Sequence, residues 1–575
     1  MWWRNSKQFR EETSKKISWG HWFALFNILW AITIGSRYAF IIDWPDTLFG
    51  KIYFFISLLG HFSFVIFTCY LLIIFPLSFL IKNERTFRGL TVIFSTIGLT
   101  LLLVDTEVFF RFNLHLSALV WNLLVNPDNG ELSRVWQIFF APMPIILLVQ
   151  MLFSRWSWQK LRSLERQKWL RPVGIFFLCS FITAHLIYAW ADAFIYRPIT
   201  MQKSNFPLSY PMTARSFLEK HGFLDKEEYS QRIAEQGRLD ALKLDYPKHP
   251  LVSTEQQNPN LIFITLSGLR SDAIVADKMP NLSAFAENAT QYQKHYSSGN
   301  QENTGLMGLF YGLSATYLDS VLSHQTQSVL LQQLQQRKYQ IGVFSSSENS
   351  TALFRQALFP QIKNTTRKLS NEQQTADFTK WLEQNKNSGK PLMGYLNLVI
   401  PTGLSEQDYL IQLDKIDQLL ALTFPQIADT DIVIITASHG YIFANQNSLN
   451  NRFTEESIRV PLIISWNALM KGKVEGLTSH VDILPTLMKH AFKVNNPISD
   501  YSQGQDLLTE PQHNWALVAN YRWNAIITAD GTQYHIDKKG NYQKYNQRNQ
   551  LESSNRPPLG LFLEVFNKER SFINK

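Results

Sequence analysis

The sequence is poor in cysteine, and this limits the chemistry that the chain can perform. Only Cys69 and Cys179 occur among 575 residues, and both lie inside long apolar runs. The more polar part of the chain therefore cannot form a disulfide, which is compatible with any compartment, and it has no cysteine nucleophile. No Cys or Ser stands in the Cys/Ser-x-Pro-x-Arg pattern that is converted to formylglycine. Formylglycine-dependent sulfate ester hydrolysis is therefore not expected.

Apolar residues are unevenly distributed, and this divides the chain into two parts. A chain of 575 residues is too long for a single hydrophobic core. Up to about Asp192 long runs of Phe, Leu, Ile and Trp dominate, whereas the remainder alternates short apolar runs with stretches rich in Asn and Gln. We expect the first part to lie in a membrane and the second to be soluble. The net charge of +9 does not favour nucleic acid as a partner, because much of the excess lies beside apolar runs, where Lys and Arg orient membrane helices.

Five apolar segments are long enough to cross a hydrocarbon core about 30 Å thick, which takes about 20 residues. They lie near residues 19–42, 52–81, 90–110, 138–153 and 173–192. The fourth is short and contains Pro142 and Pro144, so the sequence defines its limits least sharply. A cleaved signal peptide is disfavoured for the first, because its polar N-terminal tail is long and no small-residue cleavage site follows. The sequence predicts a five-helix transmembrane domain over residues 1–195.

The distribution of Lys and Arg predicts how this domain is oriented. The N-terminal tail and the second and fourth connections contain fourteen Lys and Arg, whereas the connections on the opposite side contain four. Because cytoplasmic loops carry the excess of positive charge, the N-terminus is predicted to be cytoplasmic. After five crossings the C-terminal domain then lies outside, which in a Gram-negative cell is the periplasm.

Asp105 and Glu107 interrupt the third apolar segment near its outer end. An ionisable group inside a membrane is a functional candidate. Interfacial solvation is the simpler interpretation here, and a role in helix packing or lipid sensing is the alternative. His61, alone on an apolar segment, is expected to be a hydrogen-bonded packing residue.

Residues 196–259 form a basic and aromatic juxtamembrane connector followed by a polar linker. Three prolines should keep its first half extended, after which Thr213 can cap a short helix that ends at Gly222. Cations interleaved with aromatic rings at headgroup level suit lipid phosphates. A solvated linker with ordinary membrane anchoring is the plainer alternative. The residues concerned are Arg197, Lys203, Phe206, Tyr210, Arg215, Phe217 and Lys220.

The pattern of residues 260–575 favours an α/β domain with a mainly parallel sheet. Continuous runs of Ile, Val and Leu are typical of strands buried on both faces. Functional groups in such folds collect at the carboxyl ends of the strands. Past Leu508, turn signals at Asp530–Gly531 and Gly540–Asn541 predict an antiparallel C-terminal appendage. The five strands are expected at residues 261–266, 341–344, 392–399, 432–436 and 462–465.

Five sequence blocks give this part a recognisable family resemblance. They are NLIFITLSGLRSD, SSGNQENTGLMGLFYGL, DIVIITASHG, RVPLIISW and SHVDILPTLM. Their order resembles that of the alkaline-phosphatase and sulfatase superfamily, near the lipoteichoic acid synthase and phosphoethanolamine transferase branch. Together with the membrane part and the motifs YPMTAR, SSGN, GLFYG and YSQGQDL, the chain resembles the YejM, PbgA or LapC family of inner-membrane sulfatase-like proteins over nearly its whole length.

The resemblance identifies a degenerate metal site. Active relatives hold one or two divalent metals such as Mg, Mn or Zn with an acid after the first strand, a Thr nucleophile and an Asp-His pair. The matching positions here are Ser267, Thr304, Ser438 and His439. Two anionic ligands are therefore missing, and Thr304 is expected to be a vestigial nucleophile in a pseudo-hydrolase. Asp272, Glu302 or Asp482 could instead rebuild a ligand set, whereas His439 and His480 are expected to be structural.

The same resemblance implies regulation of lipopolysaccharide synthesis. Such a protein would sense lipid A at the periplasmic face and restrain LapB, and through it FtsH, in degrading LpxC. Arg215 is the first candidate for the lipid phosphates, with Lys203, Lys220, Arg197 and Phe217 around it. Relatives can carry a second Arg where this chain has Ser216, so anion binding could be shared with the two lysines. The alternatives are a metal-dependent phosphoryl or phosphoethanolamine transferase or phosphatase acting through Thr304, and cardiolipin binding or transport.

Overall fold

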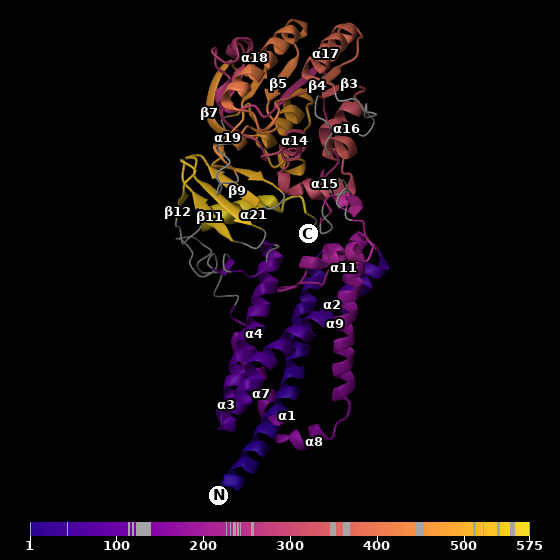
Figure 1. Ribbon diagram of the computed structural model, residues 1–575, viewed down its shortest axis with the longest axis vertical. Helices are drawn as coiled ribbons and strands as arrows, with labels where there is room; N and C mark the ends of the chain where they lie inside the picture. The colour runs from indigo at the N-terminus through magenta and orange to yellow at the C-terminus, as the bar shows by residue number, and fades with distance from the viewer. Residues whose placement is uncertain are drawn as a thin grey trace.

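In the computed structural model, a bundle of long helices stands beneath a soluble α/β part, and the C-terminal sheet lies between them (Figure 1). The N-terminus lies at the end of the bundle that is remote from the soluble part. The structure describes residues 2–42, 44–112, 115–117, 120–121, 140–225, 227–229, 232–233, 237, 241, 243–254, 258–345, 352–359, 369–443, 453–509, 513–520, 523–537, 541–552 and 558–573.

Four helices in the described residues are long and apolar enough to cross a membrane, rather than the five expected. They are α1 (Trp2–Gly35), α2 (Leu48–Cys69, which continues through a π-helical turn into α3, Phe75–Leu80), α4 (Glu84–Phe112) and α9 (Leu170–Ala193). The fourth expected segment forms the shorter α7 (Met143–Gln159), of 17 residues, and residues 138–139 lie outside the described ones. Proline is best accommodated in the first turn of a helix, and Pro142 and Pro144 lie at the start of α7.

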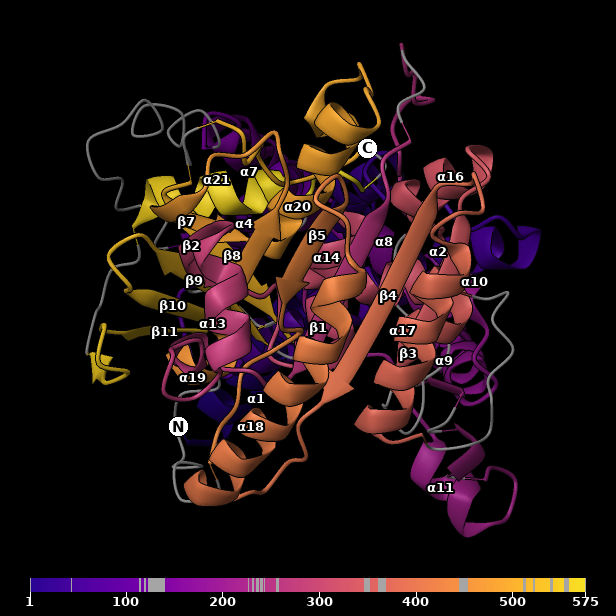
Figure 2. The ribbon, with the colours of Figure 1, turned by 90° about the horizontal axis from the view of Figure 1, so that it is seen from above.

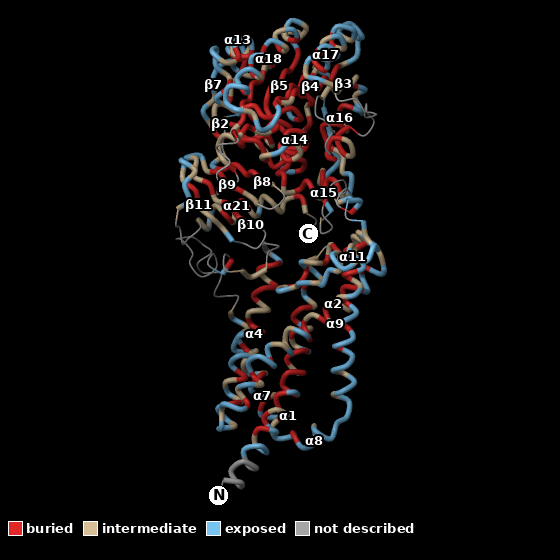
Figure 3. The backbone as a smooth tube through the Cα atoms, viewed as in Figure 1, coloured by how far each residue is buried: buried red, intermediate tan, exposed pale blue. Residues whose placement is uncertain are grey.

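Helix α1 is buried by its neighbours, whereas α9 is exposed along most of its length (Figure 3). Two buried amides join α1 to α7, since Gln150 Nε2 donates to Asn27 Oδ1 at 2.7 Å. Asp105 is also buried, and it accepts hydrogen bonds from the Tyr38 hydroxyl, from His115 Nδ1 at 2.7 Å and from the Leu116 amide at 2.5 Å. Asp105 is therefore a packing residue, and interfacial solvation does not describe it.

In the part of the chain that the structure describes, seven strands form the main sheet, in the order β3-β4-β1-β5-β6-β2-β7. All neighbours pair in parallel except β6, which is antiparallel to both β5 and β2, so the sheet is mainly parallel. The five expected strands are confirmed, and β2 and β7 are additional. Their bounds are β1 (Leu261–Ser267), β2 (Thr290–Tyr296), β3 (Gln340–Ser345), β4 (Leu392–Val399), β5 (Ile432–Thr436), β6 (Leu462–Ser465) and β7 (Gly472–Ser479).

Helices cover both faces of this sheet (Figure 2). Ile262, Ile264 and the other side chains on one face of β1 pack against α13 (Pro280–Glu287), α17 (Asn371–Asn385) and α18 (Glu406–Thr423). Phe263 on the opposite face packs with α14 (Glu302–Tyr311), α16 (Val329–Gln336) and α20 (Ile483–Thr486). Burial on both faces explains why the central strands are continuous apolar runs. The remaining short helices are α8 (Leu161–Glu165), α10 (Arg197–Thr200), α11 (Arg215–Lys220), α15 (Leu318–His324) and α19 (Glu455–Ile458).

The C-terminal appendage is antiparallel, as predicted, and its described strands form a five-stranded sheet in the order β12-β11-β10-β9-β8. Gly531, with φ of +85°, forms the turn between β9 and β10, and Gly540 of the second expected turn lies outside the described residues. Helix α21 (Leu559–Glu569) packs on the sheet through Phe562 and Val565. The strands are β8 (Trp515–Ala519), β9 (Trp523–Thr528), β10 (Gln533–Asp537), β11 (Tyr542–Tyr545) and β12 (Leu551–Glu552).

The two ends of the soluble part are tied together and to the bundle. Leu244, in the stretch expected to be a tether, is buried and forms an antiparallel bridge with Ile573. Phe572 is fully buried, and its carbonyl accepts a hydrogen bond from the amide of Asp245 at 3.0 Å. Arg570 Nη1 donates to the carbonyl of Phe110 in α4 at 3.1 Å. Residues 570–573 thus contact both the linker and a membrane helix.

Candidate functional sites

Two serine hydroxyls meet where a metal would be expected. Ser267 ends β1 and Ser438 follows β5, which is the adjacent parallel strand, and their Oγ atoms lie 2.9 Å apart. Ser267 also donates to Asn397 Oδ1 of β4 at 3.2 Å, an acceptor shared with Thr265 at 2.9 Å. All four side chains are buried. The carboxyl ends of β1 and β5 therefore converge as predicted, and β4 adds Asn397. The groups that the three strands contribute are neutral and bonded to one another.

Glu302 turns inward toward this cluster. Its Oε1 accepts a hydrogen bond from Asn397 Nδ2 at 3.1 Å, and burial raises the pKa of the Glu302 carboxyl to about 7. Helix α14 can approach closely because residue 305 is glycine: a Cβ there would lie 1.9 Å from the carbonyl oxygen of Ser438. Glu302 is thus the acid among the three expected alternatives that reaches the serine cluster.

Thr304, the expected nucleophile position, serves as part of a helix cap. Its Oγ1 donates to the carbonyl of Gln301 at 2.9 Å and accepts from the amide of Gln301 at 3.2 Å. The side chain is buried in the first turn of α14. A hydroxyl that closes a capping box stabilises the helix end and is already committed as donor and acceptor.

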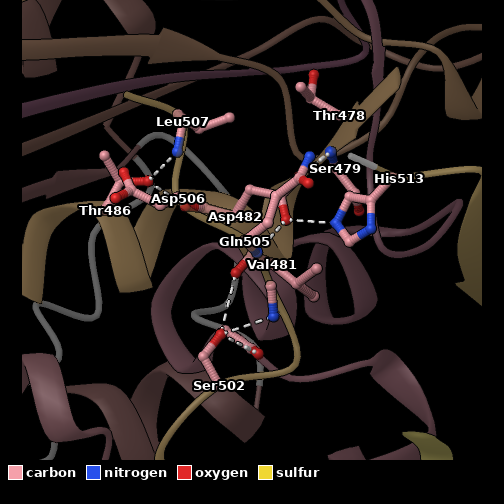
Figure 4. Close-up of polar contacts among 12 residues, drawn as sticks. Thr478, Ser479, Val481, Asp482, Thr486, Ser502, Gln505, Asp506, Leu507 and His513 are labelled. Carbon is pink, nitrogen blue, oxygen red and sulfur yellow. Dashed lines mark hydrogen bonds and ion pairs between the residues drawn. The ribbon is translucent and has the colours of Figure 1, made fainter. Parts of the chain in front are cut away.

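The neighbouring histidines and Asp482 are also held in structural contacts. His439 Nδ1 donates to the carbonyl of Gly440 at 2.8 Å, and His480 lies between Thr436 Oγ1 at 3.2 Å and the carbonyl of Gly305 at 3.1 Å. Burial lowers the pKa of His480 to about 4, which keeps it neutral. Figure 4 shows Asp482 between three donors, namely the amides of Ser479 and Gln505 and His513 Nε2, at 2.7, 2.8 and 2.8 Å.

The donor set does not fit a divalent metal. Among the described residues, no three His, Cys, Asp or Glu side chains lie where they could share an ion. Asp272, another expected alternative, is exposed and forms a two-point ion pair with Arg270, with both N–O distances 2.9 Å. Hydroxyl and amide oxygens that already bond to one another offer none of the negative charge that hard cations require.

The raised pKa of Glu302 makes a testable prediction about pH. Its folded pKa of about 7 exceeds the ordinary value of 4.5, so its contribution to stability is complete below pH 4.5 and is lost as the pH rises through 7. Glu302→Gln keeps an acceptor for Asn397 and removes this dependence. We expect the variant to gain up to about 3 kcal/mol relative to the wild type between about pH 4 and about pH 8.

Thermal unfolding of the purified protein across that range measures the effect. Glu406→Gln, at an exposed position in the first turn of α18, is the matched control. A difference between Glu302→Gln and wild type that stays constant with pH would contradict the assignment.

The connector is more helical than expected. Pro198 lies in the first turn of α10, which runs into a 3₁₀ turn over Met201–Ser204, so this part is not extended. Helix α11 does begin near the expected position, but its N-cap is Ala214 rather than Thr213. Gly222, with φ of +74°, takes the left-handed conformation that follows the helix, as predicted.

Arg215 is bound to an acid that the sequence did not single out. Its Nε and Nη2 contact the two carboxylate oxygens of Asp192 at 2.7 and 3.1 Å, and its guanidinium lies over the ring of Tyr229 at 5.3 Å. The Asp192 side chain is only 3% exposed, whereas that of Arg215 is 42% exposed. Arg215 therefore joins α11 to the end of α9, and an anion that binds Arg215 must share it with Asp192.

Three histidines hold the backbone of the connector. His61 of α2 donates from Nε2 to the carbonyl of Pro207 at 2.8 Å, in agreement with its expected packing role. His115 donates from Nε2 to the carbonyl of Ser204 at 2.8 Å. The amide of Met212 donates to His185 Nδ1 of α9 at 2.9 Å. The connector is thus attached to the membrane domain at several points before it reaches Arg215.

A cavity of about 260 Å³ lies between α2, α9 and the connector. It is lined by His61 and Phe64 of α2, His185 of α9, and Lys203 and Tyr210 of the connector. Lys203 therefore lines this cavity together with apolar and aromatic side chains. Of the other expected lipid contacts, Lys220 and Phe217 are exposed on α11. Burial lowers the pKa of Arg197, and the negative charge of Asp319 partly opposes that shift.

Two family models match the chain. One described as "Domain of unknown function (DUF3413)" matches residues 6–253, and one described as "Sulfatase" matches residues 407–494. The first spans the membrane helices and the connector, and the second spans α18, β5, β6, β7 and the helical segment after His480.

Curated relatives align with the chain from end to end. An uncharacterized protein of Haemophilus influenzae is 58% identical over 99% of this chain and 98% of its own length. The inner membrane protein YejM of Salmonella typhimurium is 42% identical over 99% of both chains. Among solved structures, a protein of the alkaline phosphatase superfamily from Vibrio parahaemolyticus matches with 14% identity and a TM-score of 0.44, covering 61% of this chain and 98% of its own. The lipoteichoic acid synthase LtaP from Listeria monocytogenes matches with 12% identity and a TM-score of 0.42, covering 56% of this chain and 93% of its own.

Proposed function

The chain belongs to the YejM family of inner membrane proteins, and on this premise we propose that it is a non-catalytic regulator of lipopolysaccharide synthesis. In this proposal the C-terminal domain lies in the periplasm and the connector recognises lipid A at the outer surface of the inner membrane. The unliganded protein restrains LapB, and through it FtsH, from degrading LpxC. Bound lipid A relieves that restraint.

The serine pair supports the absence of catalysis in this proposal. Phosphoryl transfer in the superfamily to which the fold belongs needs concentrated positive charge to offset the charge of the transition state. Ser267 and Ser438 supply neutral hydroxyls at a mutual distance of 2.9 Å, and Thr304 is engaged in a helix cap. In this proposal the fold is retained, whereas the side chains that would bind a metal and activate a nucleophile are replaced.

The cavity beside Lys203 is the observation that carries the recognition of lipid. It lies between two membrane helices and the connector, and it combines one ammonium group with aromatic and apolar walls. A phosphorylated lipid headgroup with acyl chains has the matching chemistry, since the phosphate can meet Lys203 while the chains follow the exposed faces of α2 and α9. Exposed Lys220 and Phe217 extend the same surface along α11. Arg215 contributes mainly by holding α11 in place, because Asp192 already occupies its guanidinium.

Removing the two lysines tests this proposal. We expect Lys203→Ala combined with Lys220→Ala to lower the lipopolysaccharide that co-purifies with the protein at least about fivefold, which corresponds to a loss of about 1 kcal/mol in binding. LpxC in cells should rise, because lipid A can no longer relieve the restraint. Mass spectrometry of the bound lipids and immunoblotting of LpxC measure the two effects.

Lys160→Ala is the matched control, because Lys160 is an exposed lysine next to α8, at the other end of the bundle. An unchanged lipid content in the double variant would refute the connector as the recognition site. Loss of cardiolipin alone would instead favour cardiolipin as the ligand.

A further inference from the structure

A second cavity, of about 340 Å³, lies in the soluble part at the junction between the main sheet and the C-terminal sheet. Its volume falls within the range of about 300–1,000 Å³ that is usual for small-molecule sites. Segments from both sheets line it, including the loop after β1, strand β2, helix α19 and the β9–β10 turn. Among the described residues, none of those in the membrane helices or the connector lines it, so this cavity is distinct from the lipid site proposed above.

The cavity contains a carboxylate that is only partly satisfied. Glu455 Oε1 accepts a hydrogen bond from the hydroxyl of Tyr296 at 2.9 Å. Glu455 Oε2 is buried and has no hydrogen-bond partner among the described residues. Glu456 follows directly and also lines the cavity. A buried carboxylate oxygen without a donor is unfavourable. Rotation of the Glu455 side chain toward the cavity would expose this oxygen to a ligand N–H group.

Cations line the same cavity. Lys294 is exposed on β2, and in the described part of the chain it forms no ion pair. Arg459 is anchored, because its Nε and Nη2 both donate to the carbonyl of Gln293 at 3.2 and 2.8 Å. Arg270 is balanced by its two-point pair with Asp272. Charges of both signs thus face one small volume. Glu455, Glu456 and Asp530 supply negative charge, and Lys294 and Arg459 supply positive charge. Asp530 already accepts hydrogen bonds from the hydroxyls of Thr528 and Thr532.

We propose that this cavity binds a small zwitterionic molecule of the size of a phosphorylated amino sugar. Its ammonium group would donate to Glu455 and Glu456, and its phosphate would face Lys294 and Arg459. An uncharged sugar would pair with neither the carboxylates nor the cations of the cavity. A ligand with a single charge would leave the residues of its own sign without a partner.

The cavity is connected to the degenerate metal site through backbone. The carbonyl of Glu456 accepts from the amide of Tyr441, and that of Ser457 accepts from the amide of Gly440, both at 2.9 Å. Gly440 and Tyr441 follow the Ser438–His439 pair directly. A ligand bound to α19 would therefore be linked, through these two hydrogen bonds, to the segment that follows Ser438 and His439.

Equilibrium binding to the purified full chain tests the inference with three probes: glucosamine 6-phosphate, glucose 6-phosphate and glucosamine. We expect glucosamine 6-phosphate to bind at least about tenfold more tightly than either analogue with one charged group. Glu455→Gln keeps an acceptor for Tyr296, and it should remove the preference over glucose 6-phosphate. Lys294→Ala, at an exposed position, should remove the preference over glucosamine.

Lys380→Ala, an exposed position on α17, is the control and should bind like the wild type. The inference is overturned if none of the probes shows saturable binding up to about 10 mM, a concentration that would still detect very weak complexes. It is equally overturned if Glu455→Gln and Lys294→Ala both retain the wild-type preference.

Discussion

A chain that carries Ser267→Asp together with Ser438→Asp is expected to lose about 3–5 kcal/mol of stability in the absence of divalent metal and to regain much of it when Mn²⁺ is added. The two Oγ atoms lie 2.9 Å apart in a buried position. Two carboxylates placed there repel each other and cannot both remain ionised without a cation between them. The substitutions would thus return to the site the charge that its hydroxyls lack.

Thermal unfolding with a chelator and then with Mn²⁺ measures this effect. A metal present at 100 times its dissociation constant adds about 2.7 kcal/mol to the stability of the state that binds it. Ser267→Ala with Ser438→Ala is the control, since it removes the same hydrogen bond without adding charge. The wild type and this control should both be insensitive to Mn²⁺.

A wild-type melting temperature that rises with Mn²⁺ would contradict our interpretation of the serine cluster. Metal-dependent hydrolysis of aryl phosphate esters by the wild type, lost in Thr304→Ala, would establish the enzymatic alternative. A double aspartate variant that is as stable as the wild type in chelator would show that the two side chains do not meet as described.

Arg215→Ala is expected to destabilise the protein by about 2 kcal/mol, because it leaves the carboxylate of Asp192 buried without its partner. Removing one member of a fully buried pair costs about 3–5 kcal/mol, and the partial exposure of Arg215 reduces that value. Adding Asp192→Asn should restore most of the loss, since the remaining amide is neutral. A double-mutant cycle of thermal unfolding measures the coupling between the two residues.

Lys220→Ala, on the same short helix, is the control and should change stability by less than about 0.5 kcal/mol. Equal losses in Arg215→Ala with and without Asp192→Asn would rule out the pair as the cause. This prediction also affects lipid experiments, because a lower lipid content in Arg215→Ala alone would not separate lost recognition from a displaced α11.

Much of the soluble fold was predictable because its central strands are buried on both faces. Strands β1, β4 and β5 are buried along almost their whole length, and apolar residues dominate them except at Thr265, Ser267, Asn397 and Thr436. Strand β2, with the sequence TQYQKHY, and strand β7, with GKVEGLTS, were missed because polar residues interrupt them. These two strands lie next to each other at one end of the sheet, where part of their surface is exposed.

The sequence predicted the positions of the long membrane helices but not the polar contacts between them. Hydropathy located α1, α2, α4 and α9, and it overestimated α7 because apolar character alone does not show where a helix can begin. The pairing of Asp192 with Arg215 depends on the connector folding back onto the end of α9. An acid at the end of an apolar run, followed by basic residues, was the available signal.

The position of the serine cluster was predictable, but its hydrogen bonding was not. Ser267 and Ser438 could be located from the order of the strands, since parallel neighbours bring their carboxyl ends together. The bond between them, and the inward turn of Glu302 toward Asn397, depend on side-chain geometry that sequence does not encode locally.

The last residues of the chain give the soluble part a second attachment. If the connector were the only attachment, the soluble part could rotate relative to the membrane helices. A second attachment comes from Arg570, which donates a hydrogen bond to Phe110 of α4. The bridge between Ile573 and Leu244 holds this segment against the linker. Two attachments prevent free rotation and leave a hinge motion about the line that joins them. The tilt of the soluble part is therefore coupled to α4, and removing residues 570–573 would end that coupling.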